Sequence, residues 1–139
     1  MRRLACLLLL LLPALGWAAG DLSQQEPVVV EVQLGTADNA LRFVPGTLTF
    51  ETGKLYKLVL RNPSPQKHYF TSLGFAAAVW TRKVETPDAE IKGAIREIEL
   101  LPGGKAEWYF VPVQAGTFEL YCHRPGHREA GMVGTITIR

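Results

Sequence analysis

The chain has 139 residues, of which 47% are apolar and 20% are charged, and its formal net charge is only +2. This length is typical of one ordinary domain. A nearly neutral chain without a run of basic residues gives no support for nucleic-acid binding.

The first twenty residues have the pattern of a secretory signal peptide. A short positive head precedes an almost wholly apolar run at residues 4–12, and small residues follow as far as Gly20. The apolar run is too short for a convincing membrane span, so we expect cleavage after Gly20 or, as an alternative, after Ala18. We therefore expect residues 1–20 to be a signal peptide and residues 21–139 to form a single periplasmic or secreted domain without a membrane segment.

The rest of the chain reads as short strands separated by turns. Apolar and polar side chains alternate in several segments, and Gly/Pro pairs separate some of them. Short strands at regular intervals with Gly/Pro turns favour an all-β sandwich or barrel. The expected strands lie at residues 28–34, 41–44, 48–51, 56–60, 68–73, 95–101, 107–111, 118–122 and 133–138.

One region departs from this strand pattern. Residues 74–94 combine an Ala-rich apolar run with a polar stretch, and the segment from Pro87 to Ile91 could begin a short helical turn. We expect a partly helical insertion between strands here, around residues 75–94.

A segment near the C-terminus contains three candidate metal ligands. Cys122, His127 and Met132 follow one another at intervals of five residues, and no other Cys or Met remains once residues 1–20 are removed. An exported protein usually pairs its cysteines, so a single thiol needs an explanation. Pairing with another chain is one explanation and metal ligation is another, which the neighbouring His and Met favour. Two imidazoles, a thiolate and a weak axial thioether form the ligand set of electron-transfer copper.

Strand geometry favours a common site for these groups. Alternate side chains share one face of a strand, so Cys122 should point inward at the end of its strand, and Met132 begins the next one. His127 lies in the loop between them. The fourth ligand must be His68 or His123. His123 follows the cysteine directly and should point to the opposite face, whereas His68 opens a strand after a Pro-rich turn, so we expect His68.

Several segments resemble the type 1 copper motif of the cupredoxins, the small blue copper proteins that include the plastocyanin, azurin and rusticyanin groups. Upstream segments also look like the N-terminal half of those proteins, and the resemblance covers roughly residues 28–139. The segments are Tyr121-Cys122, Pro125-Gly126-His127, Gly131-Met132-Val133-Gly134, Phe43-Val44-Pro45-Gly46, Gly53-Lys54-Leu55-Tyr56 and Asn62 with His68-Tyr69-Phe70.

The resemblance implies a Greek-key β-sandwich with one type 1 copper ion at one end, ligated by His68, Cys122, His127 and Met132. It also implies a monomeric, exported carrier of single electrons whose partner is a redox protein such as a cytochrome or an oxidase. The alternative is a periplasmic copper-binding protein for copper tolerance, buffering or delivery, which would meet a copper-handling protein instead.

Two other readings are weaker. Multicopper oxidases have a similar Cys-His-x3-His-x4-Met segment, with His123 in the matching place. Their trinuclear centre needs more histidines than the three of this chain, so we do not expect an enzyme. Zinc could bind His68, Cys122 and His127, but zinc does not recruit thioethers, and Met132 therefore argues against it.

Overall fold

The computed structural model describes residues 20–139, so the expected signal peptide lies outside the described residues except for Gly20. None of the helices in the described range is long and apolar enough to cross a membrane. The elements are η1 (Leu22–Gln24), β1 (Val28–Leu34), β2 (Phe43–Val44), β3 (Thr47–Phe50), β4 (Tyr56–Arg61), β5 (His68–Thr71), α1 (Leu73–Ala77), β6 (Val79–Glu85), β7 (Glu90–Ile91), β8 (Glu97–Leu100), β9 (Lys105–Pro112), β10 (Gly116–Tyr121) and β11 (Val133–Ile138).

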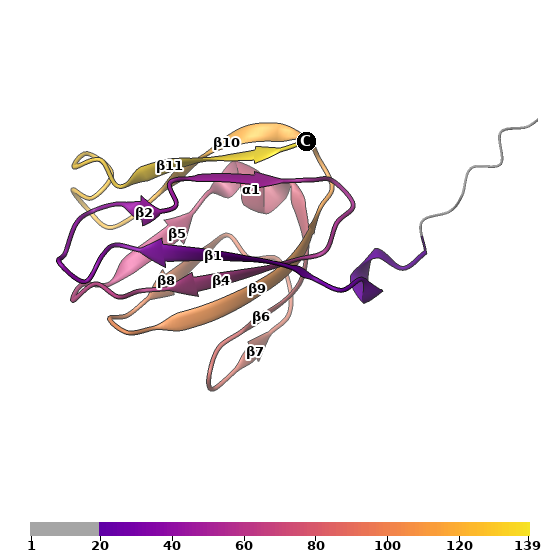
Figure 1. Ribbon diagram of the computed structural model, residues 1–139, viewed down its shortest axis with the longest axis horizontal. Coiled ribbons are helices and arrows are strands. Elements are labelled where there is room, and N and C mark those ends of the chain that lie inside the picture. The colour runs from indigo at the N-terminus through magenta and orange to yellow at the C-terminus, as the bar shows by residue number, and fades with distance from the viewer. Residues whose placement is uncertain (1–19) are drawn as a thin grey trace, which may run out of the picture.

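The strands form two sheets that pack face to face (Figure 1). One sheet has the order β2-β1-β4-β9-β6-β7, and the other has the order β3-β11-β10-β5-β8. The pairs β1–β4 and β11–β3 are parallel and the remaining pairs are antiparallel. The all-β Greek-key sandwich expected from the sequence is confirmed.

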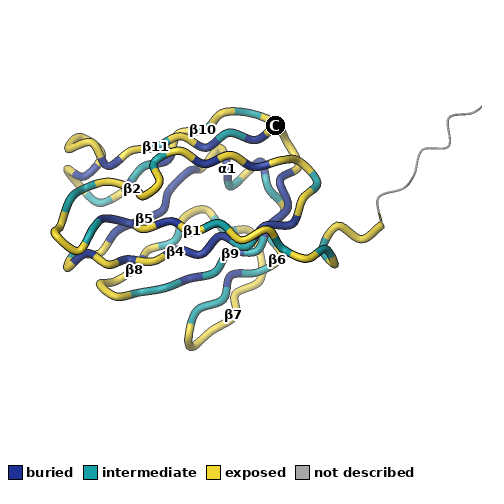
Figure 2. Tube along the Cα trace, in the orientation of Figure 1, coloured by how far each residue is buried: buried dark blue, intermediate teal, exposed yellow. Residues whose placement is uncertain are grey.

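The core lies between the sheets, where the inward-facing side chains of both are buried (Figure 2). Its centre is aromatic: Phe75 of α1 lies 5.5 Å from Phe50, 5.6 Å from Trp108 and 5.2 Å from Phe110, measured between ring centroids. Edge-to-face and offset contacts of this kind are the favoured arrangements of aromatic rings. The alternation of inward apolar residues that predicted the strands is therefore the pattern that builds this core.

The region around residues 74–94 differs in part from the expected insertion. Its helix is α1, after which β6 and β7 form a hairpin at the edge of the six-stranded sheet. The expected helical turn at Pro87 was wrong, because Thr86 and Ala89 close a tight turn in which the Thr86 N–H donates to the Ala89 carbonyl at 2.8 Å. Pairing along β9, with a β-bulge between Thr81 and Lys83, makes a strand of β6.

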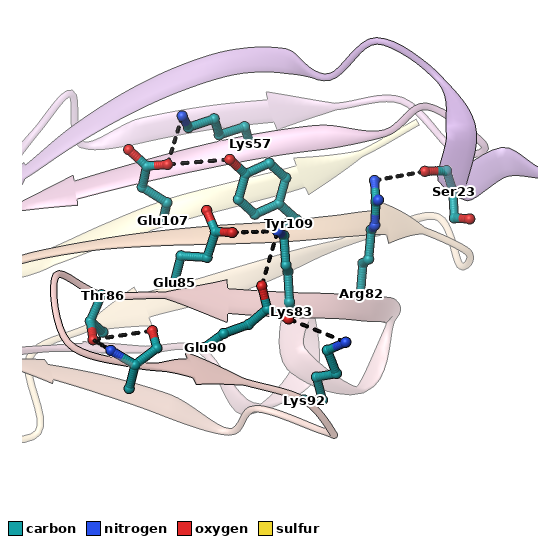
Figure 3. A network of polar contacts seen from close by, with 11 residues as sticks. Ser23, Lys57, Arg82, Lys83, Glu85, Thr86, Glu90, Lys92, Glu107 and Tyr109 are labelled. Atoms are coloured by element: carbon teal, nitrogen blue, oxygen red, sulfur yellow. Dashed lines mark hydrogen bonds and ion pairs between the residues drawn. The ribbon is translucent and has the colours of Figure 1, made fainter.

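Charged side chains connect neighbouring strands of the six-stranded sheet, in the β6–β7 hairpin and between β4 and β9 (Figure 3). Lys83 pairs with Glu85 on its own strand and lies 3.2 Å from a carboxylate oxygen of Glu90 on β7. Lys57 of β4 lies 2.6 Å from Glu107 of β9. Partly exposed pairs such as these contribute little stability one by one, but opposite charges on neighbouring strands favour the observed register.

One end of the sandwich gathers the segments that matter for function (the left side of Figure 1). β10 ends and β11 begins at paired residues, Tyr121 and Val133, so residues 122–132 form a loop at this end. β5 begins at the same end with His68, opposite Leu100, the last residue of β8. Residues far apart in the sequence are thereby brought together.

Candidate metal centre

Three buried side chains meet at this end of the sandwich. The Cys122 Sγ atom lies 3.8 Å from His68 Nδ1 and 3.6 Å from His127 Nδ1. The ligand atoms of the three residues all lie within 4.8 Å of one another. Within residues 20–139, no other group of three or more His, Cys, Asp or Glu side chains is placed to hold a metal ion.

The separations of these atoms fit a metal ion. Bonds of about 2.0–2.3 Å from a first-row ion to imidazole nitrogen and thiolate sulfur, at angles of roughly 110–120°, place such donors roughly 3.6–3.8 Å apart. The two distances from Cys122 Sγ fall in this range. Imidazole and thiolate are also the donors that copper accepts, whereas a magnesium or calcium site requires oxygen ligands.

Met132 completes the set from the end of this loop, next to the start of β11. Its side chain is fully buried, and its backbone is tied to two of the other residues. The Cys122 N–H donates to the Met132 carbonyl at 3.1 Å, and the Met132 N–H donates to the His127 carbonyl at 2.9 Å. His68, Cys122, His127 and Met132 together have the arrangement of a type 1 copper site.

The loop that carries His127 is folded by its own backbone. The His127 N–H donates to the Arg124 carbonyl at 3.1 Å, and the Gly131 N–H donates to the Arg128 carbonyl at 3.0 Å. Gly131 has a φ of +97°, a conformation that glycine adopts at little cost. The sequence therefore allows a compact turn that returns the chain from Cys122 to β11.

Arg128 fastens this loop to β10. Its guanidinium donates to the Glu119 carboxylate through Nε, at 3.1 Å, and through a terminal nitrogen as well. The same group lies over the Tyr121 ring, 4.5 Å from its centroid. A two-pronged ion pair combined with stacking restricts the residue next to His127 more than a single surface ion pair would.

A buried amide holds the segment that leads to His68. The Asn62 side chain donates to the carbonyls of Gln66, at 2.7 Å, and Leu100, at 2.9 Å, and accepts from the Ser64 N–H at 3.0 Å. The segment before β5 is thus fixed to the end of β8. The sequence marked Asn62 as part of a Pro-rich turn and of the segments that resemble the cupredoxins, but its bond to Leu100 could not be predicted because Leu100 lies on another strand, 38 residues away.

The thiol also receives a backbone hydrogen bond. The Tyr69 N–H points at Cys122 Sγ with a nitrogen–sulfur distance of 3.4 Å. A donor aimed at sulfur stabilises negative charge on it, and hydrogen bonding around the cysteine sulfur tunes the potential of blue-copper sites. No side-chain motif in the sequence signals this contact, since it depends on how β5 lies beside Cys122.

Both histidines of the site favour the neutral form. Burial, together with the nearby His127 and Arg124, lowers the pKa of His68 from 6.5 to about 4. Burial and Arg124 also lower the pKa of His127. A neutral imidazole has a free lone pair for a metal ion, so the protein environment keeps these groups ready to bind one.

His123 lies apart from this cluster, as its position after Cys122 predicts. Its side chain is 63% exposed, and Nδ1 lies 3.0 Å from a carboxylate oxygen of Glu97. The Thr71 hydroxyl donates to the same oxygen at 2.9 Å. His123 therefore belongs to a surface network and not to the buried donor set.

Comparisons with known proteins agree with this geometry. The chain matches the family model of copper binding proteins, plastocyanin/azurin family, over residues 30–139. It is 34% identical over 125 residues to the copper-resistant cuproprotein CopI of Rubrivivax gelatinosus, covering 86% of this chain and 71% of that protein. It is 32% identical over 124 residues to the chloroplastic plastocyanin of Pisum sativum, covering 87% of this chain and 66% of that protein.

Solved structures show the same fold. Auracyanin B matches with a TM-score of 0.59 at 23% identity, over 83% of this chain and 91% of that one. A multicopper oxidase of Aquifex aeolicus matches with a TM-score of 0.62 at 13% identity, but the match covers only 29% of the oxidase chain. With a family match across nearly all the described residues, the resemblance seen in the sequence is confirmed: the chain belongs to the plastocyanin/azurin family of copper-binding proteins, the cupredoxins.

Proposed function

We propose that this cupredoxin carries single electrons, with His68, Cys122, His127 and Met132 as the ligands of one type 1 copper ion. The observation that carries the proposal is the arrangement of the donors: two imidazole nitrogens lie 3.6 and 3.8 Å from the Cys122 sulfur. Copper bound there supplies one-electron chemistry by alternating between its +1 and +2 states. A site whose geometry is set beforehand by rigid strands needs little rearrangement when the charge changes.

Other features of the protein would adjust the charge on the sulfur, exclude water and provide a route for the electron. The Tyr69 N–H stabilises charge on the Cys122 sulfur, and burial keeps water away from both sulfur ligands. His127 is 7% exposed whereas His68 is fully buried, so the His127 ring is the ligand through which the centre reaches the surface. A redox partner docked over the loop at residues 122–132 would exchange electrons there.

The place of action belongs to the same proposal. Residues 1–20 would direct export and be removed, and residues 21–139 would act as a monomeric domain in the periplasm or outside the cell. The signal-like N-terminal sequence supports this, since its apolar run is followed by small residues.

The test is to add Cu(II) to the purified metal-free protein and record the visible spectrum. An intense thiolate-to-copper band should appear at one equivalent of copper and be lost in Cys122→Ser, whereas His123→Gln, a change at an exposed histidine outside the donor set, should keep it. Stopped-flow mixing of the reduced protein with an oxidised cytochrome should then show fast electron exchange. Absence of the band, or its survival in Cys122→Ser, would reject the proposed ligands.

Copper tolerance is a second candidate, favoured by the 34% identity to the copper-resistant cuproprotein CopI. A tolerance protein must bind or release the ion as its cargo, so copper should pass to a competing chelator within the time of a cellular response. A deletion strain would distinguish the two functions. Sensitivity to excess copper with intact respiration supports tolerance, and impaired respiration without copper sensitivity supports electron transfer.

A further inference from the structure

His68 lacks the hydrogen bond that a buried histidine usually makes. Its Nδ1 faces Cys122, and its other ring nitrogen, Nε2, is buried without any hydrogen-bond partner. Among residues 20–139 it is the only buried side-chain nitrogen or oxygen in this condition. Histidines that bind metals almost always donate the second N–H to a carboxylate, carbonyl or water, which fixes the orientation of the ring. Something else must fix the orientation of this ring.

The back of the ring lies against Gly35, the residue that follows β1. A Cβ atom added to Gly35 would lie 2.6 Å from His68 Nε2 and 3.0 Å from Cδ2 of the same ring. The same point is 2.9 Å from Ser64 Cβ. Contacts this short do not occur between real side chains, so the imidazole fills the space that only glycine leaves open.

Gly35 is itself held in place. Its N–H donates to the Arg42 carbonyl at 2.9 Å, and its φ is +74°. Ser64, on the other side of the space, is fixed by the hydrogen bond from its N–H to Asn62. The surface behind the ring is therefore rigid, and any added atom must displace the imidazole.

We propose that Gly35 is the positioning residue for His68, holding the imidazole by contact where other metal-binding histidines use a hydrogen bond. The inference rests on the proposed copper function of the same site. It assigns to the residue that follows β1, in a segment that contributes no ligand, control over the angle at which Nδ1 meets the ion. A side chain at position 35 would tilt the ring and change the copper spectrum, the reduction potential and the affinity, while the fold would persist.

The experiment compares Gly35→Ala with Gly53→Ala. Gly53 also has a positive φ, +78°, but has nothing within 4 Å of an added Cβ, so its substitution carries the backbone strain without the contact. Gly35→Ala should weaken copper binding by about 10-fold or more, shift the thiolate-to-copper bands and move the potential, as loss of outer-shell support does elsewhere. Gly53→Ala should keep the wild-type spectrum and potential. A wild-type spectrum and potential in Gly35→Ala, or an equal change in Gly53→Ala, would overturn the inference.

A second variant distinguishes the steric contact with the His68 ring from the backbone strain at position 35. Asn tolerates a positive φ better than Ala but brings a larger side chain, so Gly35→Asn should disturb the site at least as much as Gly35→Ala. A milder effect of Asn would show that strain is the cause and would overturn the inference.

Two measurements on the wild-type protein complete the test, and the variants are needed again only if no copper binds. In the reduced, Cu(I)-loaded protein, which is diamagnetic, the His68 Nε2–H proton should show no scalar coupling across a hydrogen bond in NMR spectra, and a detected acceptor would contradict the proposal. If the wild-type protein forms no thiolate-to-copper band, the proposed function has failed. The positioning role is then judged on the metal-free protein, where the His68 ring signals should shift in Gly35→Ala and not in Gly53→Ala, and unchanged signals in Gly35→Ala would overturn it.

Discussion

Cys122 and the two imidazoles beside it show how the surroundings of a residue set its chemistry. His68 is fully buried, and the pKa of both histidines lies below the ordinary value because charging them would require desolvation. The carbonyl of Met132 accepts a hydrogen bond from the Cys122 N–H, which holds the backbones of these two residues together. At this scale the site is a set of buried donors whose two histidines favour the neutral form.

Acid should destabilise the metal-free protein through His68. Its pKa is about 4 in the folded state and 6.5 ordinarily, so the fold disfavours the protonated form. The contribution of the neutral ring is therefore complete above pH 6.5 and is lost as the pH falls toward 4, about 3 kcal/mol in all. Urea unfolding across this window should show the decline, and His68→Gln should make it shallower. An equally steep decline in that variant would assign the effect to other groups.

Replacing Met132 by Leu should leave a folded copper protein with a higher reduction potential. Leu has a similar volume, so the free energy of unfolding should fall by less than about 1.5 kcal/mol. The potential should rise because an axial donor stabilises the more highly charged oxidised ion, and its removal leaves an apolar neighbour. Voltammetry and denaturant titration measure the two quantities. A lower potential would show that the Met132 sulfur does not donate to the ion.

At the scale of elements, two loops at one end of the sandwich position the histidines in different ways: one contains His127 and the other leads into His68. The loop at residues 122–132 is closed by hydrogen bonds between near neighbours, and Arg128 fastens it to β10. The segment before β5 depends on Asn62, whose partners include the carbonyl of Leu100 on β8. The first loop is closed mainly by contacts that are local in sequence, whereas the second is also held by Leu100, which only the fold makes a neighbour of Asn62.

Asn62→Ala should loosen the second loop. It would leave the carbonyls of Gln66 and Leu100 and the N–H of Ser64 without the partners that they have in the structure. Each buried group left unpaired costs about 1–3 kcal/mol, and because water can replace some partners we expect a loss of about 2–4 kcal/mol in unfolding free energy. Copper should also dissociate faster, since His68 follows this loop. Arg61→Ala, at the exposed neighbouring residue, is the control and should change neither stability nor dissociation.

At the scale of the whole molecule, two sheets closed over an aromatic core hold one end rigid enough to place the ligands. Phe75 links the short helix α1 to both sheets, through Phe50 on β3 and through Trp108 and Phe110 on β9. The same buried core contains both these aromatic rings and the two sulfur residues, Cys122 and Met132.

Phe75→Ala should destabilise the protein without changing its copper spectrum. Phe75 is fully buried, and truncating a buried Phe to Ala costs about 3–5 kcal/mol because it removes contacts and leaves a cavity. Leu73→Ala, in the same helix but 45% exposed, should cost less than about 1 kcal/mol. Thermal unfolding and the visible spectrum of the loaded variants provide the two readouts. A changed spectrum in Phe75→Ala would mean that the core and the copper end are mechanically coupled.

Much of the fold could be read from the sequence because strands have a period of two residues. The alternation at residues 28–34 and 133–138 located both strands at the bounds that the structure gives. β6 was missed, since its side chains alternate only between half-buried and exposed positions until Val84, and its pairing with β9 is a tertiary contact. The helical turn expected at Pro87 failed for the same reason: the hairpin is stabilised by its partner strand and not by local propensity.

The sequence by itself determined the sandwich class, the family and the soft donor set, because strand alternation, motif spacing and donor chemistry are local properties. It also indicated which side of β10 each residue faces, separating Cys122 from His123. Only the tertiary structure decided that His68 lies beside a cysteine 54 residues away, that the Tyr69 N–H points at its sulfur and that Gly35 lies behind its ring. Such contacts join different strands, and their distances are set by how the two sheets pack, which no local pattern encodes.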